Sequence, residues 1–315
     1  MKKVTVSAPG KLHITGEHAV VYGKPSLIVA TSLRLYVTLS KQGEVSLAAL
    51  RKKDAYIDAI ANAFEKKYAK VLAPPCFITI DSAIPMGSGM GSSAALAVAL
   101  IGALSVWHNE PWNVQAIHDS AYVAEKTKHK NSSGSDPAVS AHGGILWYRK
   151  ELEFLKTLWL LSFKIPRTFS PFVLINTGRT ESTGDLVQMV AEQKTRDEAR
   201  FAGLLSRIEN VTKEITSALH DEREEAFRDG LRTNEQLLET MGVVSPSAQL
   251  LIRDIEKIGG VAKISGAGGK NRGSGVVFAS HPEPARIKKL AKQHGYPSFE
   301  TQLGGAGVQR EQIIV

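Results

Sequence analysis

The sequence predicts an α+β protein built from two lobes. Apolar residues make up 43% of the 315 residues and charged residues 22%, which is typical of a globular chain long enough for one large domain or two packed lobes. Segments with the periodicity of strands and of helices occur in both halves. A polar connector bracketed by Pro166 and Pro171 separates the halves. We therefore expect an N-terminal domain over residues 1–165 and a C-terminal domain over residues 166–315.

Strands and helices are expected to mix in the first half. Short runs rich in β-branched and aromatic residues, or with alternating polarity, predict strands at Val4–Ser7, Leu33–Leu39, Cys76–Ser82 and His142–Arg149. The first of these strands is expected to end at Pro9-Gly10. Helical spacing with a charged face predicts a helix over Lys52–Val71. Ala94–Leu104 is apolar all round, which indicates a buried helix.

The second half is expected to be richer in helix. Apolar residues in steps of three and four predict one face of a helix, at Leu204, Ile208, Val211, Ile215 and Leu219. Ser245-Pro246 interrupts the helical pattern, and Ala248–Ile258 resumes it. Strands are expected at Phe172–Asn176, Val261–Ile264 and Gly275–Phe278, the last two on either side of a glycine cluster.

Composition excludes several classes of protein. The formal net charge of +8 favours anionic partners such as phosphates, carboxylates or nucleic acid. No basic run carries interleaved aromatic residues, so we do not expect nucleic-acid binding. The single cysteine, Cys76, excludes an intrachain disulfide and a four-cysteine zinc site. The first residues hold no apolar core of signal-peptide length, and Ala94–Leu104 is far shorter than the roughly 20 residues of a membrane span, so we expect a cytoplasmic protein without a membrane partner.

Three glycine-rich segments carry the functional signal. The first glycine segment covers residues 8–11 and 16–23, the second covers residues 85–95, and the third covers residues 265–269 and continues to residue 273. In the second, an expected strand runs into a glycine-rich turn and then into the buried helix. Glycines let backbone N–H groups approach a ligand, and a helix N-terminus adds free donors, so this arrangement suits a phosphate. Ser92 and Ser93 can cap that helix, contact phosphate oxygens or hold a metal.

The well-known phosphate motifs do not match these segments. A P-loop requires Lys after its last glycine, where this chain has Ser92. The dinucleotide-binding fingerprint, Gly-x-Gly-x-x-Gly, requires a third glycine at its last position. This chain has Ser92 there when the pattern starts at Gly87, and Asn271 when it starts at Gly266. The His-Arg-Asp and Asp-Phe-Gly signatures of protein kinases are absent from the sequence.

Taken together, the first and second segments resemble the GHMP kinase superfamily, whose members phosphorylate small metabolites with ATP. Ala-Pro-Gly-Lys followed by Gly-Glu-His-Ala-Val-Val-Tyr-Gly resembles the mevalonate kinases within it, and residues 234–242 resemble the segment before that family's last glycine loop. The likeness runs from residue 4 to about residue 280. It implies a two-lobed GHMP fold, with a first lobe like domain 2 of ribosomal protein S5 and a ferredoxin-like second lobe, and with ATP and acceptor meeting between them.

The resemblance also implies roles for individual residues. Asp136, in Ser-Gly-Ser-Asp, matches the catalytic base, and Lys11 matches the lysine that activates the acceptor hydroxyl. Ser93 and Glu125 match the ligands of Mg²⁺. Residues that match acceptor contacts are Lys11, Glu17, His18, Asp136 and Thr183. Residues that match the ATP loops are Pro85, Gly87, Ser88, Gly89, Met90, Gly91, Ser92, Ser93, Ala94, Gly266, Ala267 and Gly268.

The implied activity is phosphorylation of (R)-mevalonate to 5-phosphomevalonate by ATP, in isoprenoid precursor synthesis, by an enzyme that is a possible homodimer. The sequence departs from the family pattern in two places. Ser132 stands where the family has a proline before Ser-Gly-Ser-Asp, and Gly269 is followed by Lys270 and Arg272 where the family usually has further glycines and often a cysteine or an aspartate. The two cations can serve ATP, serve a phosphate on the acceptor, or point outward. Because the two cations could bind an acceptor phosphate, a phosphomevalonate kinase is one alternative. A catalytically silent nucleotide-binding regulator is a separate one.

Overall fold

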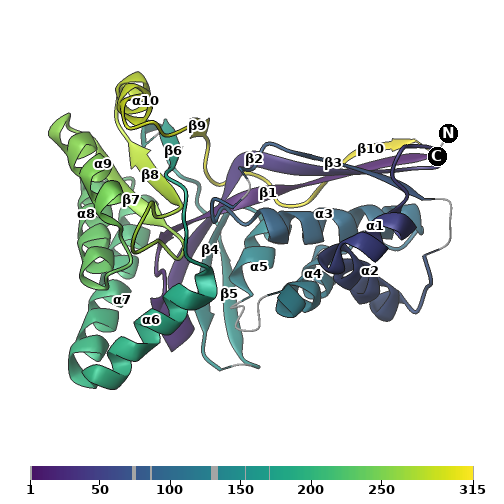
Figure 1. Cartoon of the computed structure of the whole chain (residues 1–315), viewed down its shortest axis with the longest axis horizontal. Coiled ribbons are helices and arrows are strands. Elements are labelled where there is room, and N and C mark those ends of the chain that lie inside the picture. Colours follow the sequence, from purple (N-terminus) through teal and green to yellow (C-terminus); the bar gives the residue numbers. More distant parts are fainter. Residues whose placement is uncertain are drawn as a thin grey trace.

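The computed structural model describes residues 2–72, 76–85, 87–128, 134–152, 154–169 and 171–314. It has two lobes, each with an antiparallel sheet covered by helices (Figure 1). The α+β architecture expected from the sequence is confirmed. No helix within the described ranges is both long enough and apolar enough to span a membrane.

The sheet of the first lobe has the strand order β10-β1-β2-β4-β5, with β3 also paired to β2. Its strands are β1 (Lys3–Thr15), β2 (Ser26–Ser40), β3 (Phe77–Ser82), β4 (Ile145–Lys150), β5 (Lys156–Leu161) and β10 (Gln309–Ile314). Its helices are α1 (Leu47–Lys53), α2 (Ala55–Tyr68), α3 (Ser92–Trp107), α4 (Val114–Lys128) and α5 (Ser135–His142), with a 3₁₀ turn η1 (Ala19–Tyr22). Since β10 pairs with β1, the two ends of the chain lie side by side (Figure 1).

The sheet of the second lobe has the strand order β7-β8-β6-β9. Its strands are β6 (Phe172–Asn176), β7 (Val261–Ser265), β8 (Val276–Ser280) and β9 (Ser298–Thr301). Its helices are α6 (Thr183–Arg196), α7 (Glu198–His220), α8 (Glu224–Thr240), α9 (Pro246–Lys257) and α10 (Pro284–Gln293), with a 3₁₀ turn η2 (Arg167–Phe169). The division expected at residues 165 and 166 falls between β5 and β6 and stays a prediction.

Most of the expected elements are present at or within a few residues of their expected bounds. Helix α3 is buried on almost every side and packs against β1 and β2, as its all-round apolar sequence predicts. The five apolar residues of the stripe in α7 are all buried. Pro246 occupies the first turn of α9, where its missing N–H costs no helical hydrogen bond.

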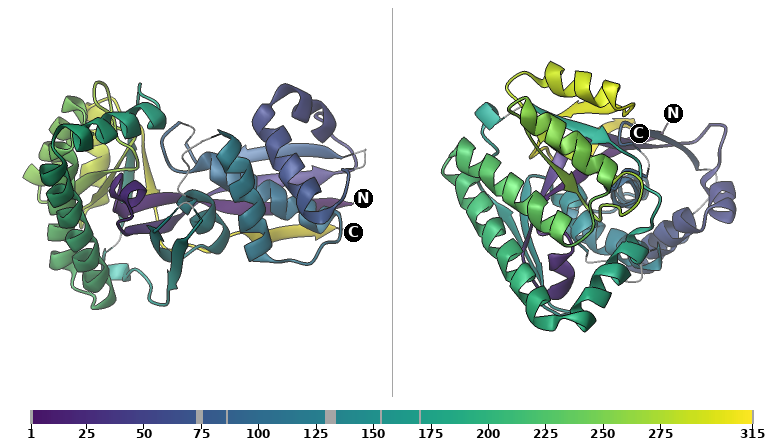
Figure 2. Two further views of the ribbon diagram at one scale, coloured as in Figure 1. Left: turned by 90° about the horizontal axis from the view of Figure 1, so that it is seen from below. Right: turned by 60° about the vertical axis from the view of Figure 1, so that its left-hand side comes forward.

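Strand β1 continues past Pro9-Gly10 to Thr15, so the expected end of this strand was wrong. The pairing register with β2 shifts between Pro9 and Lys11, and this irregularity accommodates the proline within the strand. The Lys11 N–H donates instead to the Met90 carbonyl oxygen at 2.9 Å. The extended β1 reaches from the N-terminal end of the molecule into the second lobe, where it contacts β7 and α8 (Figure 2).

Two other expectations need correction. The helix expected over Lys52–Val71 is two helices, because Asp54 has an extended backbone and its side chain accepts hydrogen bonds from the first N–H groups of α2. The strand expected from His142 begins at Ile145, because His142 is the last residue of α5 and the two following glycines have positive φ. In both cases a local capping or glycine signal overrides the broader pattern.

Candidate active site

A lysine of β1 and an aspartate of α5 form the centre of the site. Lys11 Nζ lies 3.2 Å from Asp136 Oδ2. Asp136 is in the first turn of α5, after Gly134, which has the left-handed conformation. The Lys11 side chain is 6% exposed but that of Asp136 is 36% exposed, so a ligand can reach the carboxylate.

The charge state of Asp136 follows from its neighbours. Burial favours the neutral acid, but the charge of Lys11 is the largest opposing effect, and the pKa of Asp136 is held well below its usual range. The helix N-terminus at α5 also favours the anion. Asp136 is therefore ionised at neutral pH, which is the state a proton acceptor requires.

The sequence analysis did not single out His13, yet its Nε2 atom lies 3.8 Å from Asp136 Oδ1. His13 and Lys11 are two residues apart on β1, so both side chains point to the same face of the strand. The only sequence feature that could have identified His13 is its position two residues after Lys11, the lysine of the Ala-Pro-Gly-Lys motif. It becomes informative only once β1 is known to continue past Gly10.

The second glycine segment forms an open turn at the N-terminus of α3. Gly87, Gly89 and Gly91 all have positive φ, which favours glycine, and a Cβ atom at Gly87 or Gly89 would meet no atom within 4 Å. Gly91 is the N-cap of α3, and no side chain caps the helix. Ser92 and Ser93 therefore lie within the first turn and do not cap it, which leaves the turn's N–H groups available to an anion.

Gly91 also makes room for Lys11. A Cβ atom at position 91 would lie 2.8 Å from Lys11 Cγ, inside van der Waals contact. Together with the hydrogen bond from the Lys11 N–H to the Met90 carbonyl, this close approach fixes the lysine beside the glycine turn.

The third glycine segment, from the second lobe, faces the second. A Cβ atom at Gly266 would lie 3.7 Å from the Gly89 carbonyl oxygen, and one at Gly275, two residues after the third segment, would lie 3.0 Å from the Ser88 carbonyl oxygen. The structure thus brings together the two loops that the sequence analysis assigned to ATP. Because the loops come from different lobes, a ligand held by both would lie between the lobes.

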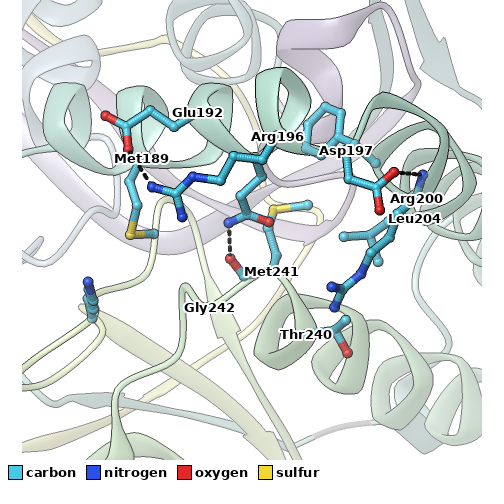
Figure 3. Close-up of a pocket in the computed structure, with 12 residues that line it drawn as sticks. Met189, Glu192, Arg196, Asp197, Arg200, Leu204, Thr240, Met241 and Gly242 are labelled. Atoms are coloured by element: carbon cyan, nitrogen blue, oxygen red, sulfur yellow. Dashed lines mark hydrogen bonds and ion pairs between the residues drawn. The ribbon is translucent and has the colours of Figure 1, made fainter.

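The two cations of the third segment lie on the protein surface. Lys270 and Arg272 are exposed. Lys270 lines an open pocket of about 420 Å³ between α6, α7 and α8, shown in Figure 3, and neither Lys11 nor Asp136 is among the residues that line it. Between the two cations, Asn271 is tied to Glu181 by hydrogen bonds of 2.9 and 2.7 Å from its N–H and Nδ2.

Glu17 and His18 connect the first glycine segment to the second lobe. Glu17 Oε1 lies 2.5 Å from Lys263 Nζ of β7, and both side chains are buried. His18 Nε2 lies 2.9 Å from the Ala267 carbonyl oxygen in the third segment. The contacts of these two residues thus run to β7 and the third segment, and their role at the acceptor stays a prediction.

A second buried carboxylate accompanies this ion pair. Glu235 Oε2 accepts a hydrogen bond from the Ile264 N–H at 2.8 Å, and the side chain is almost completely buried. Burial raises the pKa of Glu235 to about 8, although the Lys263 charge acts in the opposite direction.

The two expected metal ligands lie close to each other. The Tyr56 hydroxyl is 2.8 Å from Glu125 Oε1 and 3.1 Å from the Ser93 carbonyl oxygen, and its one proton can be donated to either. Burial and the Glu125 charge raise the pKa of Tyr56 above its usual range, so the tyrosine stays a donor. Tyr56 could not be identified from the sequence, because its spacing in α2 does not distinguish it from a packing residue.

The donor set suits Mg²⁺. Glu125 and Ser93 offer oxygen atoms, which this hard cation prefers, and Mg²⁺ is usually held by one or two protein oxygens with phosphates and water. Within the described ranges, no group of three His, Cys, Asp or Glu side chains is arranged to hold a metal. Two protein oxygens would leave the other coordination positions of the cation to phosphates and water.

Two other predicted positions are less informative. Thr183 is the first residue of α6 and is exposed, next to Ser182, which caps that helix. Among the described residues, Thr183 makes no hydrogen bond or ion pair with Lys11 or Asp136. Ser132, the departure before the Ser-Gly-Ser-Asp motif, lies outside the described residues, as does the first serine of that motif.

This arrangement has the parts that phosphoryl transfer requires. An open glycine turn at a helix N-terminus can hold phosphates, a fixed lysine can offset the developing charge, and an ionised carboxylate can accept the proton of an attacking hydroxyl. The carboxylate is reachable from solvent, while the lysine is fixed by its surroundings.

Comparison with known proteins agrees with this assignment. The model of the GHMP kinases N terminal domain matches residues 55–144. The mevalonate kinase of Thermococcus sibiricus is 30% identical to this chain, with 99% of both chains covered. Two solved structures share the fold: L. major mevalonate kinase in complex with R-mevalonate (TM-score 0.80, 21% identity, 95% of each chain) and Streptococcus pneumoniae phosphomevalonate kinase in complex with phosphomevalonate and AMPPNP (TM-score 0.75, 16% identity, 95% of this chain and 99% of the other). This chain belongs to the mevalonate kinase family of the GHMP kinases.

Proposed function

We propose that this chain transfers the γ-phosphoryl group of ATP to the 5-hydroxyl of (R)-mevalonate, giving ADP and 5-phosphomevalonate, a step of isoprenoid precursor synthesis. The observation that carries the proposal is the Lys11–Asp136 pair, 3.2 Å apart, with the lysine fixed beside the uncapped N-terminus of α3. The acceptor is proposed from relatives: the Thermococcus sibiricus protein is a mevalonate kinase, and the L. major structure holds R-mevalonate.

In this proposal the triphosphate of ATP lies against the second and third glycine segments. The backbone N–H groups of residues 87–91 and of the first turn of α3 bind its oxygens, and the helix dipole adds a favourable field. Gly266, Ala267 and Gly268 approach from the second lobe. Lys11 then faces the γ-phosphate, because it passes directly beside Gly91.

Asp136 acts as the general base. Its low pKa keeps it ionised, and its exposure lets the acceptor hydroxyl donate a hydrogen bond to it. Lys11 stabilises the negative charge that develops on the hydroxyl oxygen as the proton leaves, and it offsets the charge of the transferred phosphoryl group. The remaining roles, of Glu17, His18 and Thr183 at the acceptor, rest on the family resemblance.

Ser93 and Glu125 would hold Mg²⁺, as their oxygen donors and shared contact with Tyr56 suggest. When bound, Mg²⁺ neutralises charge on the β- and γ-phosphates. Tyr56, which stays protonated, orients the Glu125 carboxylate by donating to it.

The nearest alternative is a phosphomevalonate kinase, which would use Lys270 and Arg272 for the acceptor's phosphate. The position of Lys270 argues against this alternative. Lys270 lines the pocket between α6, α7 and α8, and neither Lys11 nor Asp136 lines that pocket. Replacing both Lys270 and Arg272 with glycine distinguishes the two activities. If the cations bind ATP, the KM for ATP changes in this variant. If they only face solvent, no KM changes. If they bind an acceptor phosphate, the KM for 5-phosphomevalonate rises about ten- to a hundred-fold, the value of a lost charge-assisted hydrogen bond.

The alternative of a catalytically silent regulator is tested by turnover itself. A silent protein would bind ATP without releasing ADP when any acceptor is added. The ionised Asp136 beside Lys11 favours an active enzyme, because a protein that only binds nucleotide has no use for a proton acceptor there.

A further inference from the structure

We propose that His13 receives, from Asp136, the proton that Asp136 removes from the acceptor hydroxyl. His13 is thus a positioning and proton-accepting residue that acts through the base without touching the acceptor. The inference rests on the proposed phosphoryl transfer and adds a residue that lies outside the motif positions of the family resemblance.

The position of His13 gives it access to the base but not to the acceptor. Lys11 Nζ lies 3.2 Å from one carboxylate oxygen of Asp136, and His13 Nε2 lies 3.8 Å from the other. The His13 side chain is 9% exposed, compared with 36% for Asp136. Of the two groups, Asp136 is therefore the one that is more accessible to an incoming hydroxyl.

The hydrogen bonds of Ser26 fix the tautomer of His13. The Ser26 hydroxyl donates its only proton to the Thr15 carbonyl oxygen at 2.8 Å. Its oxygen can therefore only accept from His13 Nδ1, which is 3.0 Å away, so Nδ1 carries a proton. In a neutral imidazole the other nitrogen then has its lone pair free. That nitrogen, Nε2, is the one that faces Asp136.

The charges around His13 keep it neutral before the reaction. Four titratable or charged groups interact with His13. They are Lys11 of β1, Asp136 of α5, and Glu17 and His18, which follow the end of β1. Burial lowers the pKa of His13, and Lys11 lowers it further, while Asp136 and Glu17 act in the opposite direction. The net direction is downward, so Nε2 is unprotonated and able to accept at neutral pH.

The proton transfer balances as follows. The electron pair of the acceptor's O–H bond becomes available to form the new O–P bond, and the bond between the γ-phosphorus and the bridging oxygen breaks, leaving its pair on ADP. The proton passes to Asp136 Oδ1 and from there to His13 Nε2, so Asp136 returns to the carboxylate that pairs with Lys11. The Nε2–Oδ1 separation must close by about 1 Å, a change that is ordinary when a catalytic site closes on its substrates.

The test compares His13→Asn with wild type across pH. Asparagine keeps an N–H donor for Ser26 but has no acceptor in place of Nε2. We expect the kcat of the variant to fall by about ten- to a hundred-fold at neutral pH, with the KM values for ATP and acceptor within about two-fold of wild type. In wild type, kcat falls as the pH drops through the pKa of His13, because the protonated ring cannot accept; in the variant this dependence disappears. His281→Asn, which alters a buried histidine of the second lobe, should leave the profile unchanged.

A spectroscopic measurement keeps the proposal testable apart from activity. In ¹⁵N-histidine NMR spectra of the whole chain, His13 should show the tautomer protonated at Nδ1, and Ser26→Ala should reduce that tautomer's population. A wild-type Nε2–H tautomer overturns the proposal, as does a kcat in His13→Asn that is unchanged or that falls equally at every pH. If wild type does not phosphorylate mevalonate, the proposed function fails. The role of His13 can still be decided, from its tautomer in the NMR spectra and from the pH dependence of kcat with an acceptor that does lead to ADP release.

Discussion

The Lys11 ammonium lies 3.2 Å from the Asp136 carboxylate, and the backbone of the same lysine is hydrogen-bonded to the second glycine segment. One residue thus links the proposed base to the proposed phosphate site. Its side chain runs past Gly91, where any other residue would collide with it. The relative position of base and phosphate is therefore set by the backbone of β1, which pairs with β2 at Lys11.

Replacing Lys11 with methionine should lower kcat much more than it weakens ATP binding. The ammonium acts mainly on charge that develops during the reaction, and removal of one such group costs on the order of 10²–10³ in kcat. We expect less than a ten-fold change in the Kd of ATP, measured by calorimetry. Lys257→Met, at the exposed end of α9, is the control and should change neither. An unchanged kcat for Lys11→Met would remove the lysine from the mechanism.

Glu125→Gln and Ser93→Ala should each raise the Mg²⁺ concentration that gives half-maximal rate. Each change removes a charge or an oxygen donor from a hard cation. The measurement is a MgCl₂ titration at fixed ATP, with Glu209→Gln, which weakens a half-buried ion pair with Lys24, as the control. Titration curves identical to wild type in both variants would reject the metal assignment.

Gly91→Ala should impair catalysis, whereas Gly295→Ala should not. Both glycines have a φ near +75°, so alanine brings strain of about 1–2 kcal/mol at either position. Only at position 91 does the new Cβ atom also collide with Lys11, at 2.8 Å from Cγ, while position 295 has no atom within 4 Å. We expect both variants to lose similar stability in urea unfolding, and only Gly91→Ala to lose kcat, by about ten-fold or more. Equal kcat values would show that Lys11 does not depend on this close approach.

Glu235 should make the folded protein less stable as the pH rises. Its pKa is about 8 in the folded state, compared with 4.5 for an exposed glutamate. The folded state therefore holds a proton that the unfolded state has lost, and the free energy of unfolding falls between about pH 4.5 and pH 8. Glu235→Gln, which stays neutral, should match wild type near pH 5 and be more stable than wild type at pH 8.5. Urea unfolding at both pH values measures this, with the exposed Glu214→Gln as control. A difference between variant and wild type that does not grow with pH would contradict the raised pKa.

Helices and strands with a clear periodicity of apolar residues were predictable from the sequence. The apolar stripe of α7, the all-apolar α3 and the short apolar strand β6 follow from periodicity, since burial on one face or on all faces selects those patterns. The continuation of β1 beyond Pro9 was not predictable in this way. It depends on a shift in the pairing with β2, and pairing between distant segments leaves little trace in a local window.

The same distinction applies to the site. The residues of the three glycine segments could be identified from their motif likeness, and the structure places the second and third segments against each other. Contacts across the fold could not be identified. His13 beside Asp136, Tyr56 beside Glu125, and Lys263 paired with Glu17 each join residues far apart in the chain, and nothing in their local sequence marks them.

Release of ADP from ATP in the presence of different acceptors tests the account most directly. The acceptors are mevalonate, 5-phosphomevalonate, galactose and homoserine, each compared between wild type and Asp136→Asn. We expect turnover by wild type with mevalonate and none with the other three, and a loss of about 10²–10⁴-fold in the Asp136→Asn variant with ATP binding retained. Turnover with 5-phosphomevalonate and none with mevalonate, or a near-wild-type rate in Asp136→Asn, would contradict it.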